Sequence, residues 1–156
     1  MRARTLLAGL TVLPLLAVAA ALYTQYRMDM MPCAWCVLQR LMFVVVAAAG
    51  LLGLVLPGAA LRRAAGVLAL LAAAGGITAA LWQHFVANAS ASCAMSLADR
   101  LMGATGLDSR FPEVFAAYAS CADAKVDLLG LPYEFWSLGL FVVLALAAAR
   151  VIARPA

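Results

Sequence analysis

Four cysteines carry the most distinctive chemistry in this sequence. They are Cys33, Cys36, Cys93 and Cys121. The first two form a Cys-x-x-Cys motif directly after Pro32, a residue suited to the first turn of a helix. On a helix the two sulfurs share one face, and the N-terminal amide groups and macrodipole favour a thiolate there. The motif therefore predicts a redox dithiol that can be attacked and re-formed. Val37 stands where a c-type haem attachment needs His, so that use of the motif is excluded.

The second pair, Cys93 and Cys121, lies among small and polar residues that are typical of accessible loops. An accessible disulfide can be attacked by the thiolate of a partner protein. Closing the long loop between these two residues would also brace the fold, by roughly 3 to 4 kcal/mol in the chain-entropy model. Their spacing thus leaves both a redox role and a structural role open.

The composition excludes an ordinary soluble domain. Of the 156 residues, 67% are hydrophobic and only 12% are charged, whereas soluble domains have roughly 25% charged residues. So little polar surface cannot cover a water-exposed sphere, and much of the chain must contact lipid. The net charge is +4, but the sequence contains no run of basic residues interspersed with aromatic residues. We therefore expect no nucleic-acid partner.

Four stretches are apolar and long enough to cross a membrane. We expect helices at about 5–26, 36–57, 64–85 and 131–152, with exterior loops at about 27–35 and 86–130. The predicted fold class is an all-α membrane protein, a four-transmembrane-helix bundle that forms a single integral membrane domain over residues 1–156. The first stretch also resembles a signal peptide, because residues 17–21 are small. Cleavage there would leave three crossings.

Arginines indicate which helix ends face the cytoplasm. The N-terminal tail, the loop around residues 62–63 and the C-terminal tail contain arginines without acidic residues, while all seven acids lie in 27–40 and 86–134. By the positive-inside rule both termini are expected in the cytoplasm of a bacterium, with a multi-pass arrangement in the inner membrane. All four cysteines then lie on the periplasmic side, where disulfides persist.

The long periplasmic loop is predicted to carry a short amphipathic helix. Apolar residues recur at helical spacing from Met95 to Met102, and polar residues such as Asp99 fall on the other side. Two placements fit this pattern. The helix could lie on the membrane surface and hold the loop over the first cysteine pair, or it could pack on the top of the bundle.

Arg40 and His84 are candidate cofactor-binding residues at the same membrane face. Arg40 lies one helical turn after Cys36, and a cation near the hydrocarbon boundary is costly unless it is paired. Its alternative role is to snorkel to the lipid headgroups. His84 ends the third apolar stretch, where a histidine is commonly an interfacial or capping residue. Because no haem, flavin or nucleotide motif is visible, a lipid quinone fits best as the electron acceptor.

Together these motifs resemble the disulfide bond formation protein B (DsbB) family, the quinone-linked membrane oxidases of the bacterial envelope. The resemblance covers essentially the whole chain. The motifs that carry it are Pro-Cys-x-x-Cys with Arg four residues later, a polar residue and His ending the third helix, a loop cysteine, Cys121-Ala, Asp127-Leu-Leu-Gly-Leu and Trp136-Ser-Leu-Gly. One departure is Gln83, where the family can have an acidic residue.

The resemblance implies a relay of disulfide exchange that supports disulfide bond formation. Cys93 would be attacked by a reduced periplasmic thioredoxin-like oxidase of the DsbA type. Cys121 would resolve this mixed disulfide and then exchange with Cys33. The enzyme would thus be a quinone-dependent protein-dithiol oxidoreductase.

The resemblance also implies how the electrons leave the protein. Cys36 would face ubiquinone or menaquinone, Arg40 would polarise the quinone, and His84 would lie near the same ring. A cation in that position stabilises both a thiolate and a developing quinone anion.

Two alternatives remain beside this interpretation. The vitamin K epoxide reductase family also combines a four-helix core, a Cys-x-x-Cys motif and loop cysteines with a quinone, but its loop pair precedes the Cys-x-x-Cys motif. The other alternative is a structural zinc site made by the four thiolates, which the spacing permits. The oxidising face argues against zinc, and we expect no bound metal.

Overall fold

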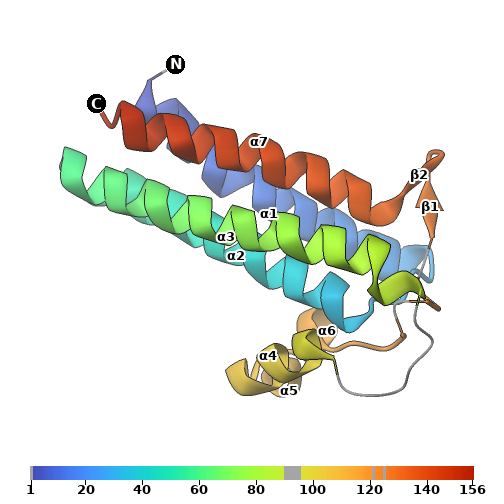
Figure 1. Cartoon of the computed structure of the whole chain (residues 1–156). Helices are drawn as coiled ribbons and strands as arrows, with labels where there is room; N and C mark the ends of the chain where they lie inside the picture. The colour runs from blue at the N-terminus through green and yellow to red at the C-terminus, as the bar shows by residue number, and fades with distance from the viewer. Residues whose placement is uncertain (1, 90–95, 121, 125) are drawn as a thin grey trace.

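The computed structural model describes residues 2–89, 96–120, 122–124 and 126–156. Two predicted site residues, Cys93 and Cys121, lie outside these ranges. Four long helices in the described chain lie side by side as a bundle (Figure 1), and each is long and apolar enough to cross a membrane. They are α1 (Ala3–Arg27), α2 (Ala34–Val55), α3 (Ala59–Phe85) and α7 (Tyr133–Ala153). This confirms the predicted fold class of an all-α membrane protein.

Short elements connect α3 to α7. They are η1 (Ala87–Ala89), α4 (Leu97–Thr105), α5 (Leu107–Arg110), α6 (Pro112–Phe115), β1 (Asp127–Leu128) and β2 (Leu131–Pro132). All of them gather at the end of the bundle opposite the two chain termini (Figure 1). The long connection therefore covers the end at which α2 begins.

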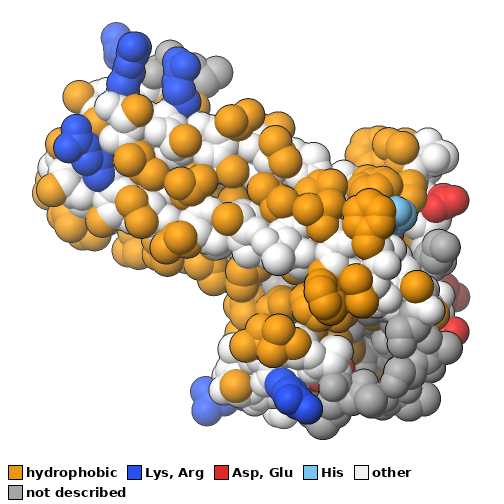
Figure 2. All heavy atoms as spheres, viewed as in Figure 1, with side chains coloured by type: hydrophobic (Ala, Val, Ile, Leu, Met, Phe, Trp, Pro, Cys, Tyr) orange, Lys and Arg blue, Asp and Glu red, His pale blue; other side chains and the backbone are white. Residues whose placement is uncertain are grey.

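The third helix begins before the uncharged stretch that predicted it. α3 begins at Ala59, ahead of Arg62 and Arg63 and of the predicted start at about 64, because the first turns of a membrane helix can extend into the polar interface. Arg62 Nη1 donates to the Pro155 carbonyl oxygen over 3.2 Å and so joins this helix start to the C-terminal tail. Basic side chains are prominent at the end that carries the termini, and the visible acidic ones lie toward the opposite end (Figure 2).

The amphipathic helix predicted in the long loop is α4. It begins with a capping box in which Ser96 Oγ accepts from the Asp99 amide and the Asp99 carboxylate accepts from the Ser96 amide. Such a box satisfies two amide groups that a helix start otherwise leaves unpaired. The cap explains why so short a segment is helical at this point of the loop.

α4 packs on the bundle through one side only. Ala98 and Met102 are buried in a cluster with the first turns of α2, whereas Leu97 and Leu101 are exposed. Met95, predicted on the same face, lies outside the described residues. α4 thus contacts the bundle, and its placement on the membrane surface stays a prediction.

The bundle core is built around two stacked rings. Phe43 of α2 and Phe141 of α7 lie parallel, with ring centroids 4.0 Å apart and an interplanar angle of 5°. The Phe141 ring rests against Gly76 of α3, where a Cβ atom would overlap the ring. Small residues let membrane helices approach closely, so Gly76 sets the distance between α3 and α7.

We expect Gly76→Ala to destabilise the bundle. The added methyl group must displace Phe141, and overpacking of this kind typically costs about 1 to 3 kcal/mol. The measurement is the midpoint of thermal unfolding in detergent, followed by circular dichroism. Gly139→Ala in α7 is the matched control, since a Cβ there meets no atom within 4 Å. Equal midpoints for the two variants would contradict the packing role of Gly76.

Candidate functional site

The Cys-x-x-Cys pair lies at the N-terminus of α2. Cys33 is the N-cap residue, with extended backbone, and Cys36 lies in the first turn. Their Sγ atoms are 3.1 Å apart, at hydrogen-bond distance. The sulfurs of a disulfide are about 2.05 Å apart, so only a small side-chain movement separates this dithiol from a disulfide. Cys33 is fully buried, whereas Cys36 lines a cavity, which makes Cys36 the sulfur that a small molecule can reach.

Two glutamines orient a hydrogen-bond donor toward the Cys36 sulfur. The Gln39 side-chain amide donates to Gln83 Oε1. This leaves the amide nitrogen of Gln83, which donates to Cys36 Sγ over 3.2 Å. An N–H group directed at sulfur suits a thiolate, the reactive form of cysteine.

Arg40 is buried one turn after Cys36. Its side chain is 6% exposed, so it does not snorkel to the surface. Nη1 donates to Gln25 Oε1 and to the Val114 carbonyl oxygen, each over 2.8 Å. Both partners are neutral, and within the described residues no carboxylate forms a salt bridge with Arg40. The guanidinium therefore holds a positive charge beside the cavity.

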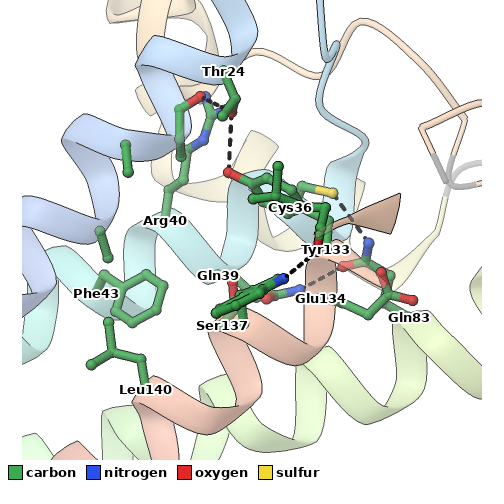
Figure 3. Close-up of a pocket in the computed structure, with 15 residues that line it drawn as sticks. Thr24, Cys36, Gln39, Arg40, Phe43, Gln83, Tyr133, Glu134, Ser137 and Leu140 are labelled. Atoms are coloured by element: carbon green, nitrogen blue, oxygen red, sulfur yellow. Dashed lines mark hydrogen bonds between the residues drawn. The ribbon is translucent and has the colours of Figure 1, made fainter. Parts of the chain in front are cut away.

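The cavity is lined by residues of α1, α2, α3 and α7 and has a volume of about 390 Å³. Figure 3 shows that its polar groups gather around Cys36, while Phe43 and Leu140 lie farther along the helices. The lining residues that α1 contributes are small or short, namely Ala17, Ala20, Ala21 and Thr24. The cavity thus offers a polar end near the reactive sulfur and an apolar end between helices.

A β-hairpin lies at the polar end of the cavity. β1 and β2 pair in antiparallel fashion around a two-residue turn, Leu129-Gly130, in which both residues have positive φ. This is the backbone of a tight hairpin turn, which glycine favours. Trp136 Nε1 donates to the Leu128 carbonyl oxygen over 2.9 Å, and both residues line the cavity. The hairpin is therefore fastened to α7 at this end.

His84, predicted near the bound cofactor, does not line the cavity itself, because Glu134 lies between them. His84 Nδ1 lies 2.7 Å from Glu134 Oε1, and Asn88 Nδ2 donates to the same oxygen over 2.8 Å. Glu134 is buried and lines the cavity, whereas His84 does not line it. His84 therefore contacts the site through Glu134.

The chain just before Cys121 is held next to the Cys-x-x-Cys motif. The backbone amides of Tyr118 and Ala119 donate to the Pro32 carbonyl oxygen over 3.0 and 3.2 Å. Pro32 directly precedes Cys33. The loop segment after α6 thus runs alongside the start of α2.

Known proteins with a similar sequence identify the family of this chain. The family described as "Disulfide bond formation protein DsbB" matches residues 3–151 of the chain. This chain belongs to the DsbB family. It is 31% identical over 156 residues to Disulfide bond formation protein B 1 of Pseudomonas syringae pv. syringae (strain B728a), covering 98% of this chain and 91% of that protein.

Other relatives show similar coverage. Disulfide bond formation protein B of Aromatoleum aromaticum is 34% identical over 137 residues, which are 85% of this chain and 82% of that protein. The protein of the same name from Escherichia coli (strain K12) is 32% identical over 140 residues, which are 86% and 78% of the two chains. Membership of the DsbB family makes this chain a membrane disulfide bond formation protein, an oxidoreductase that generates disulfides.

The DsbB match replaces the vitamin K epoxide reductase alternative. The four-thiolate zinc alternative involves Cys93 and Cys121, which lie outside the described residues. Among the described residues, no group of three or more His, Cys, Asp or Glu side chains is placed to hold a metal ion.

Sequence reasoning did not identify several polar residues of the site. Gln25, Gln39 and Glu134 were not among the candidates, and Gln83 was noted only as a departure from the family pattern. Each lies inside or at the end of an apolar stretch. A polar side chain in such a position is costly in lipid and commonly functional, and that rule could have found all four.

Proposed function

We propose that this DsbB-family protein reoxidises a periplasmic thioredoxin-like oxidase of the DsbA type and passes the electrons to ubiquinone or menaquinone in the bacterial inner membrane. Two electrons and two protons leave the partner's dithiol, which becomes a disulfide, and the quinone becomes a quinol. One observation carries the proposal. The outer sulfur of a vicinal dithiol, Cys36, opens into an apolar cavity that also holds a buried cation, Arg40.

The cavity fits a quinone in size and chemistry. Its volume of about 390 Å³ is within the roughly 300 to 1,000 Å³ of small-molecule sites. Arg40, Tyr133 and Ser137 offer donors for carbonyl oxygens, and the apolar end near Phe43 suits a prenyl chain. A bound quinone would supply a two-electron, two-proton acceptor.

The chain's own residues prepare the electron transfer. Gln83 donates to Cys36 Sγ, and Arg40 places a positive charge on the same face of α2, so both favour negative charge on this sulfur. The same charge stabilises negative charge that develops on a ligand in the cavity.

The loop cysteines connect the partner to this site. In our proposal the partner's thiolate attacks Cys93 in a disulfide between Cys93 and Cys121, which frees the Cys121 thiolate. The partner's second thiol resolves the mixed disulfide, so the partner leaves oxidised. Cys121 then exchanges with Cys33 in the disulfide between Cys33 and Cys36. The hydrogen bonds from Tyr118 and Ala119 to Pro32 support the last step, because they hold the chain next to Cys33. Each exchange conserves one disulfide, so no further oxidant is needed.

The orientation in the membrane follows from the same proposal. Both termini face the cytoplasm and the four cysteines face the periplasm. The support is the arginine-rich character of the two tails and of the loop between α2 and α3, which contain no acidic residue. The partner and the nascent disulfides then share the oxidising compartment.

Cys121→Ser is expected to trap the partner. The oxidised partner is used, because the Cys93 thiolate can attack its disulfide and form a mixed disulfide. Without the Cys121 thiol to displace the partner this adduct persists, and multiple turnover with reduced partner stops. Non-reducing electrophoresis and peptide mass spectrometry measure the adduct and its position. The double variant Cys93→Ser/Cys121→Ser is the control and should form none. Normal partner oxidation by Cys121→Ser would contradict the proposed order of exchange.

Quinone binding should be visible in the fluorescence of Trp136. This side chain lines the cavity, whereas Trp35 and Trp82 line a different groove. Added ubiquinone is therefore expected to quench the emission saturably, and Trp136→Phe should remove most of that quenching. Trp82→Phe is the matched control and should retain it. Quenching that depended on Trp82 instead would place the quinone outside this cavity.

A further inference from the structure

Glu134 is a buried carboxyl group at the polar end of the cavity. It lies in the first turn of α7, with 2% of its side chain exposed. The contacts from His84 and Asn88 both reach Oε1. No described residue forms a hydrogen bond with Oε2, and Glu134 lines the cavity. One oxygen is thus held by protein, and the other is available to the cavity.

His84 connects this carboxyl group to the outside of the bundle. Its side chain is 25% exposed, and its ring packs against Phe135 and Phe85 with centroids 4.4 and 4.8 Å apart. Nδ1 is used in the contact with Glu134, so Nε2 is the nitrogen that can exchange protons with water. Cavity, carboxyl group, imidazole and the outer surface of the bundle therefore follow one another in space.

We propose that Glu134 and His84 form the path by which protons reach the quinone. This inference rests on the proposed function, because only a quinone acceptor in this cavity takes up protons there. Apart from the dithiol itself, the polar side chains nearby are poor donors. Arg40 does not give up its proton, Gln39 and Gln83 have none to transfer at neutral pH, and a phenol such as Tyr133 is a far weaker acid than a carboxyl group.

Protons move along this path as the dithiol is oxidised. As two electrons leave the Cys33 and Cys36 dithiol, Glu134 passes a proton toward the cavity. His84 returns one to Glu134 through Nδ1, and Nε2 takes one from water. Two such cycles deliver the two protons that accompany the two electrons. The two thiol protons pass to water as the disulfide between Cys33 and Cys36 forms.

A merely structural role for Glu134 is the competing explanation, since its contacts also join η1 and α3 to α7. The sequence offers a way to observe the group directly. Glu113 and Glu134 are the glutamates of the chain, and His84 is the single histidine. Glu113 is exposed and accepts from Tyr26 through its backbone oxygen only, so Glu113→Gln leaves the site intact.

The first test uses this intact site. In Glu113→Gln protein labelled with carboxyl-¹³C glutamate, infrared difference spectra should show the Glu134 carboxyl band change when bound ubiquinone is reduced. Nitrogen-15 NMR of labelled histidine should show the His84 ring exchange protons with solvent. A Glu134 band that does not change on quinone reduction would overturn the proposal without any variant of the site itself.

The second test separates proton delivery from binding. Glu134→Gln should bind ubiquinone with a dissociation constant within about twofold of wild type and accept electrons from the reduced partner at the normal rate. Reoxidation of its Cys33 and Cys36 pair by ubiquinone should be slowed about 100-fold, the typical contribution of general acid catalysis. His84→Phe should have a similar effect, and the double variant should be no slower, because both residues act in one path.

Three results would count against this path. Reoxidation within about threefold of wild type in both variants would make the pair structural. A fall in ubiquinone affinity that accounts for the whole loss of rate would make Glu134 a binding group only. A wild-type protein that binds ubiquinone without reducing it would instead remove the proposed function, and the inference with it.

Discussion

Cys36→Ser is expected to abolish quinone-dependent oxidation of the partner. Cys36 is the sulfur that lines the cavity, 3.1 Å from Cys33 Sγ. A serine hydroxyl fills nearly the same space but cannot form a disulfide or give up electrons, so the pair loses its redox function. The measurement is anaerobic oxidation of a reduced thioredoxin-like partner with ubiquinone, where the rate should fall to the uncatalysed background.

The unchanged loop cysteines provide the control for Cys36→Ser. Cys93 and Cys121 are unchanged in this variant, so one equivalent of reduced partner should still react with a disulfide between them. Circular dichroism should show an unchanged helical content, because the substitution preserves the first turn of α2. Sustained ubiquinone reduction at a rate within tenfold of wild type would exclude Cys36 as the sulfur that faces the quinone.

Loss of the charge of Arg40 is the second large effect that we expect. Arg40→Met keeps the length of the side chain but removes the cation beside the cavity, and it leaves the Gln25 and Val114 oxygens without their donor. A hydrogen bond to a charged group is typically worth about 1.5 to 3 kcal/mol, which corresponds to roughly 10- to 100-fold. The KM for ubiquinone should rise, or kcat should fall, by that factor.

Two further variants separate charge from shape at this position. Arg40→Lys keeps the charge and should retain more quinone use than Arg40→Met, although it cannot reproduce both hydrogen bonds of the planar guanidinium. Arg27→Met removes an exposed charge at the end of α1 and should have little effect. If Arg40→Met and Arg27→Met behaved alike, the buried cation would have no role in quinone use.

Lipid explains why the helices could be predicted from the sequence. A membrane segment must satisfy its own backbone hydrogen bonds and match the thickness of the hydrocarbon layer, so long apolar stretches have few alternatives to helices. The Cys-x-x-Cys motif after Pro32 could also be placed, because proline favours a helix start. Cys36 and Arg40, four residues apart, then had to lie on one face.

The contacts between helices could not be predicted in the same way. α1 and α7 are apolar on every side, so hydrophobicity does not indicate which side faces the bundle. The pairing of Arg40 with Gln25 depends on that rotation, as does the pairing of His84 with Glu134. These contacts join residues of different helices, and no spacing rule within one helix applies to them.

The most direct test of this account is the stoichiometry of electron transfer by the wild-type protein. Purified protein, a reduced thioredoxin-like periplasmic oxidase and ubiquinone are mixed without oxygen, and quinone absorbance and partner disulfides are followed together. We predict one ubiquinone reduced for each disulfide formed, with no oxidation beyond the protein's own disulfides when quinone is omitted. Partner oxidation that continued without quinone, or quinone loss without new disulfides, would contradict the account.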